Sequence, residues 1–429
     1  MIDINTLRET PEIVIKDLEK RGDTEKIKWI ADILEKDKKW RQSINKVNEL
    51  RCKRNKVSLE ISALKKQKKD VVEKIAEMKK VASKIDALEK TIENVRVKIE
   101  YMLLRLPNIM HESVPKGVDD TKNVEVRAVG KIKKMSFEPK DHIDIGESLD
   151  LFDLERGAKV SGARFYYLKN DAVLLEFAII RFVVDQLQKD GYELIIPPML
   201  VREKVMEGAG FLPVGAEDIY KIENEDLYLV GTSEQALAGI HMGETLDAAT
   251  LPKKYAGYST CFRTEAGSHG RDTKGIFRVH QFEKIEMFVY TNPKKSWAEH
   301  EKLIKTAEKL VKMLELPYRV VNICTGDLGV VAAKKYDIEV WLPGQGKYRE
   351  LVSCSNDTDY QARRLNIKYR NKVGESPAGL VHTLNSTAVA VTRMIVAILE
   401  NYQQKDGSVK IPKVLVHYMG GKTKIIKSA

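Results

Sequence analysis

Hydrophobic side chains recur at steps of three, four and seven residues in two successive series near the start of the chain. One series runs from Ile33 to Leu64, and the other runs from Val71 to Met102. These steps are the period of a coiled coil, and no proline or glycine interrupts residues 23–106. A polar stretch at 65–70 separates the series. The pattern predicts two long helices that pair as an antiparallel hairpin over about residues 27–104.

After residue 107, longer amphipathic segments alternate with short apolar runs. Helices are predicted near Val173 to Asp190 and Ser296 to Glu315. Strands are predicted at Glu193–Ile196, Leu227–Val230, Tyr255–Phe262, Ile276–Tyr290, Ile338–Leu342 and Tyr348–Ser355. Many of these runs are joined by loops of hairpin length, which favours a mainly antiparallel sheet with flanking helices over a doubly wound parallel sheet. We therefore expect an α+β protein with domains at 1–106 and 141–429 and a connector at 107–140.

The positive charge of the chain is concentrated in the predicted hairpin. The chain carries a net charge of +11, and residues 26–105 alone hold 23 Lys and Arg against 12 Asp and Glu. The remainder is therefore balanced. This asymmetry indicates a polyanionic partner for the hairpin, with RNA favoured over an acidic membrane surface. The alternative is a solvated helix surface that is merely rich in lysine.

Composition also limits the compartment and the metal chemistry that we expect. No run of eighteen apolar residues exists and the first residues lack an apolar segment, so neither a membrane span nor a signal peptide is predicted. The cysteines are scattered, without a CxxC pair, at Cys52, Cys261, Cys324 and Cys354. This usage suits a reducing cytoplasm and disfavours both a disulfide framework and a cysteine-based zinc site.

The segment from Cys261 to Tyr290 carries charged side chains on two apolar, strand-like runs joined by a glycine-rich loop. If residues 276–290 form a strand, one of its faces carries Arg278, His280, Phe282, Lys284 and Glu286. Arg263 and Glu265 would share a face of the preceding run. Unpaired buried charge is costly, so a nucleotide-sized anion is the expected ligand. A cross-strand ladder of salt bridges is the alternative, and His280 is expected to be structural.

Spacing and missing motifs narrow the kind of nucleotide site. Phe282 and Glu286 are four positions apart, about 13 Å along a strand, which is comparable with the reach from the adenine to the amino acid of an aminoacyl-adenylate. The chain has no GxxxxGK[ST] sequence and no GxGxxG after a predicted strand. P-loop and Rossmann sites are therefore not expected.

Two pieces of this segment, FRTE at 262–265 and RVHQFEKIE at 278–286, resemble motif 2 of class II aminoacyl-tRNA synthetases in its seryl-tRNA synthetase form, the type without zinc. Motif 2 would span about 255–290. Further resemblances lie in GYELIIPPMLV at 191–201 (motif 1), VGTSEQAL at 230–237 (the amino-acid loop), ELVSCSNDTDYQARR at 350–364 (the ATP and metal segment), HTLNSTAVAVTRMIVAILENYQQKDGSVKIP at 382–412 (motif 3, centred on about 382–400) and RLPNIMHESVP at 105–115. The resemblance therefore covers nearly the whole chain.

The resemblance implies a catalytic domain that binds ATP and Mg²⁺. Arg263 would bridge the α-phosphate and the serine carboxylate, Arg393 would hold the γ-phosphate, and Arg278 would assist. The implied adenine contacts are Glu265, Phe282 and the backbone of Val279, and the other implied ATP contacts are Thr264, Leu351 and Val352. Glu350 and Ser353 would hold Mg²⁺, which prefers oxygen ligands. The implied serine site comprises Thr232, Ser233, Glu234, Arg263, Glu286, Asn385 and Thr387, with Glu286 on the serine hydroxyl.

Several of these assignments have alternatives or conditions. Glu350 and Ser353 are three residues apart, so a regular strand would put them on opposite faces, and joint metal binding needs a bulge or the end of the strand. Glu350 alone could be an ordinary strand carboxylate. Thr232 and Ser233 could cap a helix that opens at Glu234, and Asn385 could also be a helix cap. The family often has Asn-Gly-Ser where this chain has Asn-Ser-Thr at 385–387, so either Ser386 or Thr387 could contact the serine hydroxyl.

The resemblance also implies partners. The hairpin would bind the long variable arm of tRNA-Ser, with tRNA-Sec left open as a second acceptor, and the enzyme would be a cytoplasmic homodimer with Pro198 of motif 1 at the interface. The basic residues expected to meet the tRNA are Arg51, Lys53, Arg54, Lys65, Lys66, Lys68 and Lys69. The expected activity is two-step charging of tRNA with serine. A ligase that charges a carrier protein and a non-catalytic RNA-binding scaffold are the alternatives.

Overall fold

The computed structural model describes residues 1–266, 272 and 274–427. The chain divides into two compact units: Ile2–Leu106 is one, and Pro107–Ala429 together with Met1 is the other. Residues 107–140, predicted as a connector, belong to the second unit and contribute one of its strands.

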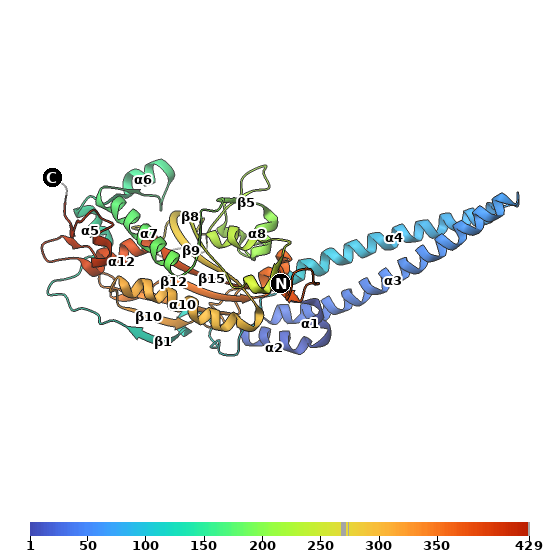
Figure 1. Ribbon diagram of the computed structural model, residues 1–429, viewed down its shortest axis with the longest axis horizontal. Coiled ribbons are helices and arrows are strands. Elements are labelled where there is room, and N and C mark those ends of the chain that lie inside the picture. Colours follow the sequence, from blue (N-terminus) through green and yellow to red (C-terminus); the bar gives the residue numbers. More distant parts are fainter. Residues whose placement is uncertain (267–271, 273, 428–429) are drawn as a thin grey trace. The chain divides into compact units, whose positions relative to one another are not determined.

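The first unit is helical, with α1 at Ile4–Glu9, α2 at Pro11–Arg21, α3 at Thr24–Lys66 and α4 at Val72–Leu103. The side chain of Asp23 caps α3 by accepting a hydrogen bond from the Lys26 backbone N–H, 3.0 Å away. Helices α3 and α4 run side by side in opposite directions (Figure 1). The predicted hairpin is therefore confirmed. Its turn lies between Lys66 and Val72, where Lys68 has a φ of 55°.

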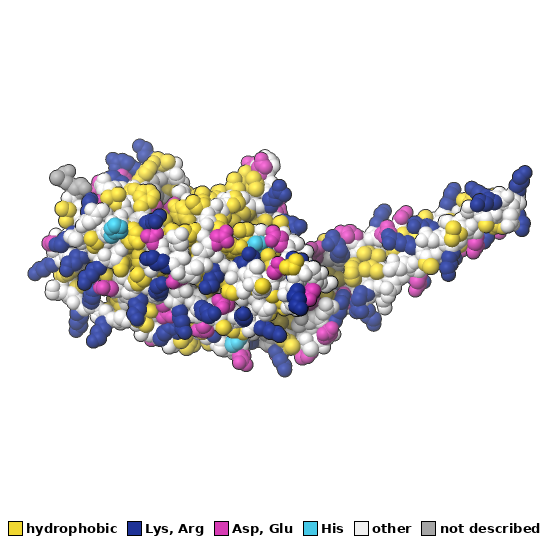
Figure 2. Space-filling view, in the orientation of Figure 1, with side chains coloured by type: hydrophobic (Ala, Val, Ile, Leu, Met, Phe, Trp, Pro, Cys, Tyr) yellow, Lys and Arg dark blue, Asp and Glu magenta, His cyan; other side chains and the backbone are white. Residues whose placement is uncertain are grey.

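An apolar seam holds the hairpin together. Val47 on α3 is buried with Val81 and Ile85 on α4, and four partly buried residues extend the seam, namely Leu50, Met78, Leu88 and Ile92. Ion pairs between the two helices, such as that of Arg51 with Glu89, are exposed. Exposed pairs contribute about 0–1 kcal/mol each, so the seam is the main source of stability. Lysine and arginine side chains crowd the surface around the hairpin tip (Figure 2).

The second unit is built on an eight-stranded sheet with the order β1-β10-β11-β12-β15-β9-β8-β4. In the described residues of this sheet, β4 and β8 are the one parallel pair, so the predicted mainly antiparallel sheet is confirmed. The strands are β1 Val124–Val129, β10 Tyr318–Asn322, β11 Lys334–Leu342, β12 Lys347–Thr358, β15 His382–Ala390, β9 Gln281–Thr291, β8 Lys253–Phe262 and β4 Glu193–Ile195.

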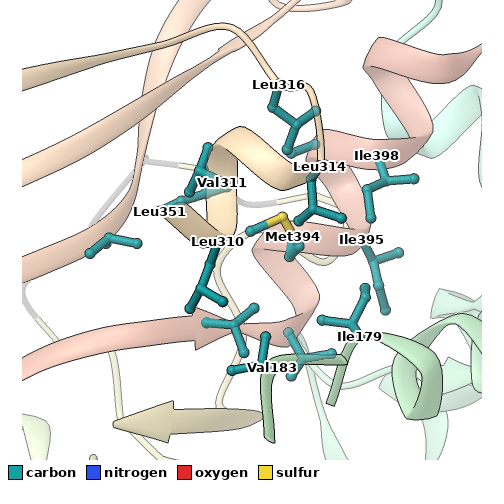
Figure 3. Close-up of a cluster of buried hydrophobic side chains, with 14 of the residues drawn as sticks. Ile179, Val183, Leu310, Val311, Leu314, Leu316, Leu351, Met394, Ile395 and Ile398 are labelled. Carbon is teal, nitrogen blue, oxygen red and sulfur yellow. The ribbon is translucent and has the colours of Figure 1, made fainter. Parts of the chain in front are cut away.

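Three long helices cover one side of this sheet: α7 (Asp171–Lys189), α10 (Ser296–Met313) and α12 (Val391–Tyr402). The first two agree with the predicted helices to within two residues at each end. Figure 3 shows where the three helices meet, with Ile179, Leu310 and Met394 pointing toward one another from α7, α10 and α12. All three side chains are at most 1% exposed.

Shorter elements complete the second unit. The helices are α5 His142–Ser148, α6 Leu154–Ser161, α8 Glu203–Ala209, α9 Ser233–Gly239, α11 Tyr360–Leu365 and α13 Lys413–Val416. The short strands are β2 Phe152–Asp153, β3 Tyr167–Leu168, β5 Leu200–Val201, β6 Tyr228–Leu229, β7 Thr245–Asp247, β13 Lys368–Arg370, β14 Gly379–Leu380, β16 Val409–Lys410 and β17 Lys424–Ile425.

Side-chain alternation along β9 places the site. Ile285, Met287 and Val289 point into the core beneath the helices. Phe282, Lys284 and Glu286 point to the other side of the sheet, where they line a cavity. Because successive side chains of a strand alternate between faces, one strand serves both the core and the site.

Two sequence predictions about strands need correction. Residues 276–280 are not part of a strand, since β9 begins at Gln281. Strands β1, β10 and β15 were not predicted; β15 lies inside the predicted motif 3, where its buried apolar run resembles a helix. Part of the predicted motif 2 loop, residues 267–271 and 273, lies outside the described residues.

Across the described residues, no helix has both the length and the apolar character needed to cross a membrane.

Candidate active site

A cavity of about 360 Å³ lies on the open face of the sheet, a volume typical of small-molecule sites. Most of the residues predicted from the sequence line it: Thr232, Glu234, Arg263, Glu265, Arg278, Val279, Phe282, Glu286, Glu350, Leu351, Ser353, Asn385, Thr387 and Arg393. Ser233, Thr264 and Val352 do not. The structure thus brings together residues that are up to 161 positions apart in the sequence, from Thr232 to Arg393.

Three arginines give one part of the cavity a strong positive charge. Arg263 follows the end of β8, and its Nε donates to the Gly231 carbonyl at 3.0 Å. Arg393 stands in the first turn of α12, where a guanidinium nitrogen lies 3.5 Å from the Glu350 carboxylate. Burial lowers the pKa of Arg393, and repulsion from Arg263 and Arg278 lowers it further, while Glu350 opposes the shift. Cations held this close favour an anionic ligand.

Arg278 reaches the cavity from the loop before β9 rather than from a strand face. It forms an ion pair of 2.6 Å with Glu265, whose φ is 53°. Glu265 therefore does not share a strand face with Arg263 either, because β8 ends at Phe262. This salt bridge joins two loop residues, so it is not a rung of the cross-strand ladder that was the alternative. Both side chains still line the cavity, because the loop returns them to it.

An aromatic ring borders the cationic part. Phe282, on β9, lines the cavity, and the guanidinium carbon of Arg263 lies 5.4 Å from its ring centroid. A second ring, Phe277, lies 4.9 Å from the guanidinium carbon of Arg393. These distances are within the range of cation–π contacts, so the rings help to fix both arginines.

A β-bulge brings Glu350 and Ser353 to the same face of β12. Ile338 pairs with Val352 and Glu339 pairs with Glu350, so Leu351 is an extra residue in the strand. Leu351 and Val352 are 3% and 1% exposed. The bulge that joint metal binding requires is therefore present, and both oxygen-bearing side chains line the cavity. Among the described residues, no group of three or more His, Cys, Asp or Glu suits a metal ion.

The other part of the cavity holds buried carboxylates. Glu234, Glu286 and Asp357 are 9%, 2% and 1% exposed. Lys284 forms an ion pair of 2.5 Å with Glu286. The amide nitrogen of Asn385 donates to Glu234 at 3.1 Å and to Asp357 at 2.8 Å. Burial, followed by repulsion from Glu286, raises the pKa of Glu234 to about 7.

The contacts decide several of the alternatives. Thr232 is the N-cap of α9, accepting from the Glu234 N–H at 3.2 Å, and it also lines the cavity. Ser233 is fully buried and donates to the Gly257 carbonyl. Asn385 is a strand residue, so the helix-cap alternative for it is wrong. Nδ1 of His280 donates to the Arg263 carbonyl at 2.9 Å, and His280 does not line the cavity.

The contacts also separate Ser386 from Thr387. The hydroxyl of Ser386 is fully buried and donates to the Thr387 carbonyl at 3.3 Å. The hydroxyl of Thr387 lies 3.3 Å from the Glu286 carboxylate and faces the cavity. Thr387 is therefore the residue of the two that can meet a ligand.

Comparison with known proteins agrees with this geometry. The family model of the seryl-tRNA synthetase N-terminal domain matches residues 1–110, and that of the tRNA synthetase class II core domain (G, H, P, S and T) matches residues 219–402. The serine–tRNA ligase of Thermococcus onnurineus is 53% identical over 442 residues, covering 98% of this chain and 96% of that protein. The chain belongs to the seryl-tRNA synthetase family. The resemblance inferred from the motifs is confirmed.

Two solved members of the seryl-tRNA synthetase family share the whole fold. The seryl-tRNA synthetase of Pyrococcus horikoshii, complexed with ATP, gives a TM-score of 0.93 at 50% identity, with 100% of both chains covered. The cytoplasmic serine–tRNA ligase of Naegleria fowleri, in complex with AMP, gives 0.87 at 38% identity, covering 100% of this chain and 99% of that one. The predicted fold class is confirmed.

Sequence reasoning missed some cavity residues of this synthetase. Ser355 and Asp357, which follow Ser353 by two and four residues along β12, also line the cavity. Their alternation with buried neighbours was a usable signal, because residues two apart in a strand share a face. Phe277 had no such signal, since it lies in a loop.

Proposed function

We propose that this chain is a serine–tRNA ligase, which activates L-serine with ATP and transfers it to the 3′ end of tRNA-Ser. A serine carboxylate oxygen attacks the α-phosphorus of ATP, which gives seryl-adenylate and releases pyrophosphate. A hydroxyl of the terminal ribose of the tRNA then attacks the acyl carbon, and AMP leaves. One observation carries the proposal: a chain of the seryl-tRNA synthetase family has a single cavity that combines three arginines with buried carboxylates.

The arginines would neutralise and position the reacting phosphates. Phosphoryl displacement depends on positioning and charge stabilisation more than on a general base. Arg263 would bridge the α-phosphate and the serine carboxylate, and its charge is felt both by Arg393 and by Glu234. Arg393 would hold the γ-phosphate, with its guanidinium oriented by the Glu350 backbone carbonyl at 2.9 Å. Arg278 would assist on the same side.

The adenine would lie against Phe282. Its ring lines the cavity, and aromatic faces stack on bases in a sequence-tolerant way. Glu265 and the backbone of Val279 would contact the adenine edge, since both residues also line the cavity. Among the remaining ATP contacts we propose Leu351 as a wall of the cavity, with the buried Val352 next to it in β12 as a support. Thr264 would support Arg263 from outside the cavity, since its backbone N–H donates to the Asp218 carbonyl at 3.1 Å.

Glu350 and Ser353 fit a magnesium ion and would hold it. Both are oxygen donors, and the bulge at Leu351 turns them to the same face. When bound, Mg²⁺ would offset negative charge on the triphosphate. The residues themselves would keep the ATP phosphates close to Arg393, because Glu350 already lies 3.5 Å from that guanidinium.

The carboxylate part of the cavity would select serine. Thr232 and Glu234 would receive the ammonium group, and Glu286, Thr387 and Asn385 would enclose the side chain. The Glu286 carboxylate, held by Lys284 and within 3.3 Å of the Thr387 hydroxyl, is suited to the serine hydroxyl. A site built to bond a hydroxyl rejects alanine strongly, because its buried groups would be left unpaired. Ser233 would act from behind as a support of the loop.

The helical hairpin would bind the long variable arm of tRNA-Ser through its phosphates. It carries the excess positive charge of the chain, and its tip is rich in lysine. Phosphate contacts give affinity that depends strongly on salt, and duplex RNA is recognised mainly by shape. Arg51 and Lys53 are engaged in ion pairs with Glu89 and Glu77, so the tip lysines are the stronger candidates. Charging of tRNA-Sec is a second activity to test.

We also propose a cytoplasmic homodimer formed through motif 1. Large apolar side chains of α7 and motif 1 stand exposed there: Phe177 at 62%, Ile196 at 76%, Met199 at 39% and Leu200 at 41%. Contiguous exposed apolar side chains mark association surfaces. Pro198 is exposed in the same stretch. Measurement of the molar mass in solution tests this part.

Serine-dependent exchange between ATP and pyrophosphate tests the proposal as a whole. We expect exchange with L-serine and none with L-alanine, followed by charging of tRNA-Ser transcripts that keep their long variable arm. A folded sample without exchange would exclude the ligase. Exchange with charging of a carrier protein instead of tRNA would favour the carrier-protein ligase, and RNA binding without exchange would favour the scaffold.

A further inference from the structure

Asp357 stands next to the proposed serine site without a role in the reaction so far. It ends the run of cavity-facing residues on β12, is 1% exposed, and lines the same cavity as Glu234. The two carboxylates are linked by one amide nitrogen: Nδ2 of Asn385 donates to Oε1 of Glu234 at 3.1 Å and to Oδ2 of Asp357 at 2.8 Å. They therefore behave as a bridged pair.

In the described part of the chain, no side-chain cation forms an ion pair with either member of the pair. Lys284, a buried ammonium that lines the same cavity, is bound to Glu286 at 2.5 Å. Gln361 adds a hydrogen bond of 2.9 Å to Glu234 but brings no charge. Ionising both buried carboxylates in this arrangement costs much free energy, because two like charges would lie close together away from water.

The charged groups around the pair come from several elements: Lys284 and Glu286 of β9, Arg263 after β8, and the α-ammonium group of Met1. Burial, followed by repulsion from Glu234, raises the pKa of Asp357 well above its usual range, and Asn385 and Met1 oppose the shift. The pKa of Glu234 is raised to about 7 for the corresponding reasons, burial and then Glu286. Without a ligand, the pair thus retains a proton near neutral pH.

We propose that Asp357 is a further substrate-binding residue, which shares one proton with Glu234 in the free enzyme and releases it when the ammonium group of serine binds. This inference rests on the proposed function, because it takes the substrate from there. The step is balanced: the cationic ammonium replaces the proton as the partner of the second carboxylate, and the proton goes to the buffer. Two ionised carboxylates then face one ammonium group.

The sign of the pH dependence follows from competition between the proton and the ammonium group. A bound cation lowers the pKa of the pair, so binding is favoured when pH is high enough to remove the shared proton. Below the pKa of the pair, serine must displace the proton. The Kd of serine should therefore rise by up to about tenfold for each unit by which the pH falls. The ammonium group of serine stays protonated throughout.

Calorimetric titration of the full chain with L-serine in buffers of different ionisation enthalpy tests the proposal. The slope of heat against ionisation enthalpy counts released protons, and we expect a release approaching one near neutral pH. Asp357→Asn keeps the shape of the side chain and the oxygen that accepts from Asn385, but it removes one of the two carboxylates. Proton release on serine binding should therefore vanish, and the Kd of serine should become nearly independent of pH. At high pH the variant should bind serine more weakly than the original chain.

Two further measurements separate the outcomes. The affinity of a non-hydrolysable ATP analogue reports whether the Asp357→Asn variant is folded. If the variant is not folded, the number of protons that the unaltered chain releases on binding serine still tests the proposal. Exchange by the unaltered chain tests the proposed function independently. Serine binding with no proton release, or a release that survives in the folded variant, would overturn the shared proton while leaving the ligase intact.

Discussion

Glu350 and Ser353 are three residues apart on β12, yet both face the cavity, because Leu351 is inserted as a bulge between the paired positions Glu350 and Val352. A single extra residue therefore creates a pair of oxygen donors that a regular strand would separate. The apolar side chains of Leu351 and Val352 belong to the main buried core cluster, so the core holds the bulge in place.

The first prediction concerns this pair. Ser353→Ala should raise the Mg²⁺ concentration needed for half-maximal exchange, because one of two donors is removed while the Glu350 carboxylate remains. At limiting Mg²⁺ the exchange rate should fall on the order of tenfold, which is the size of effect usual when a residue that supports a metal ligand is replaced. Exchange measured over a Mg²⁺ series checks this, and binding of Mn²⁺ with an ATP analogue, followed by electron paramagnetic resonance, gives a readout apart from activity. An unchanged Mg²⁺ profile would remove Ser353 from the metal site.

The sequence predicts the position of a residue correctly where local periodicity determines that position. Heptad spacing predicts the hairpin and its turn, because the two helices are adjacent in the sequence and bury their apolar residues against each other. Period-two spacing predicts Phe282, Lys284 and Glu286 on one face, since β9 is regular there. Arg278 and Glu265 reach the cavity through a loop and a residue with positive φ, which alternation cannot describe. Alternation named both residues as site candidates but wrongly placed them on strand faces, and the family resemblance named them independently.

The same reasoning explains why the two hydroxyls at 386 and 387 needed the structure. Alternation puts them on opposite faces of a strand, but only the position of β15 between β12 and β9 decides which face meets the cavity. That neighbour relation joins strands distant in the sequence. It follows from packing of the whole sheet, and no local pattern contains it.

The second prediction concerns serine selection. Thr387→Val removes the hydroxyl that lies 3.3 Å from Glu286 while keeping the shape of the side chain. It should raise the KM for serine by an amount equivalent to about 1–3 kcal/mol, the cost of leaving a buried polar group without its partner. It should also reduce discrimination against alanine in the exchange reaction. Ser386→Ala is the matched control, because its hydroxyl does not face the cavity, and it should keep both values near those of the original chain.

The third prediction concerns the γ-phosphate. Arg393→Lys keeps a positive charge but removes the planar fork that binds the Glu350 carbonyl and lies over Phe277. Exchange should fall on the order of 10–100-fold, with kcat affected more than the KM for serine, because the guanidinium acts on the transferring phosphates. Steady-state exchange at varied ATP and varied serine separates the two effects. A change confined to the KM for serine would assign Arg393 to the amino-acid site instead.

The last prediction concerns the tip of the hairpin. A variant that neutralises Lys65, Lys66, Lys68 and Lys69 should bind tRNA-Ser more weakly, and the slope of log affinity against log salt should become shallower by about one for each phosphate that the variant no longer neutralises. Lys68 is best replaced by Asn, because its φ of 55° suits that residue, and the others by Gln. Exchange without tRNA should be unaffected, since no residue of the hairpin lines the cavity. A matched control neutralises four exposed lysines of the second unit, Lys372, Lys405, Lys410 and Lys413. Because it changes the net charge equally, an equal change of slope in that control would mean that the hairpin acts only through the overall charge of the protein.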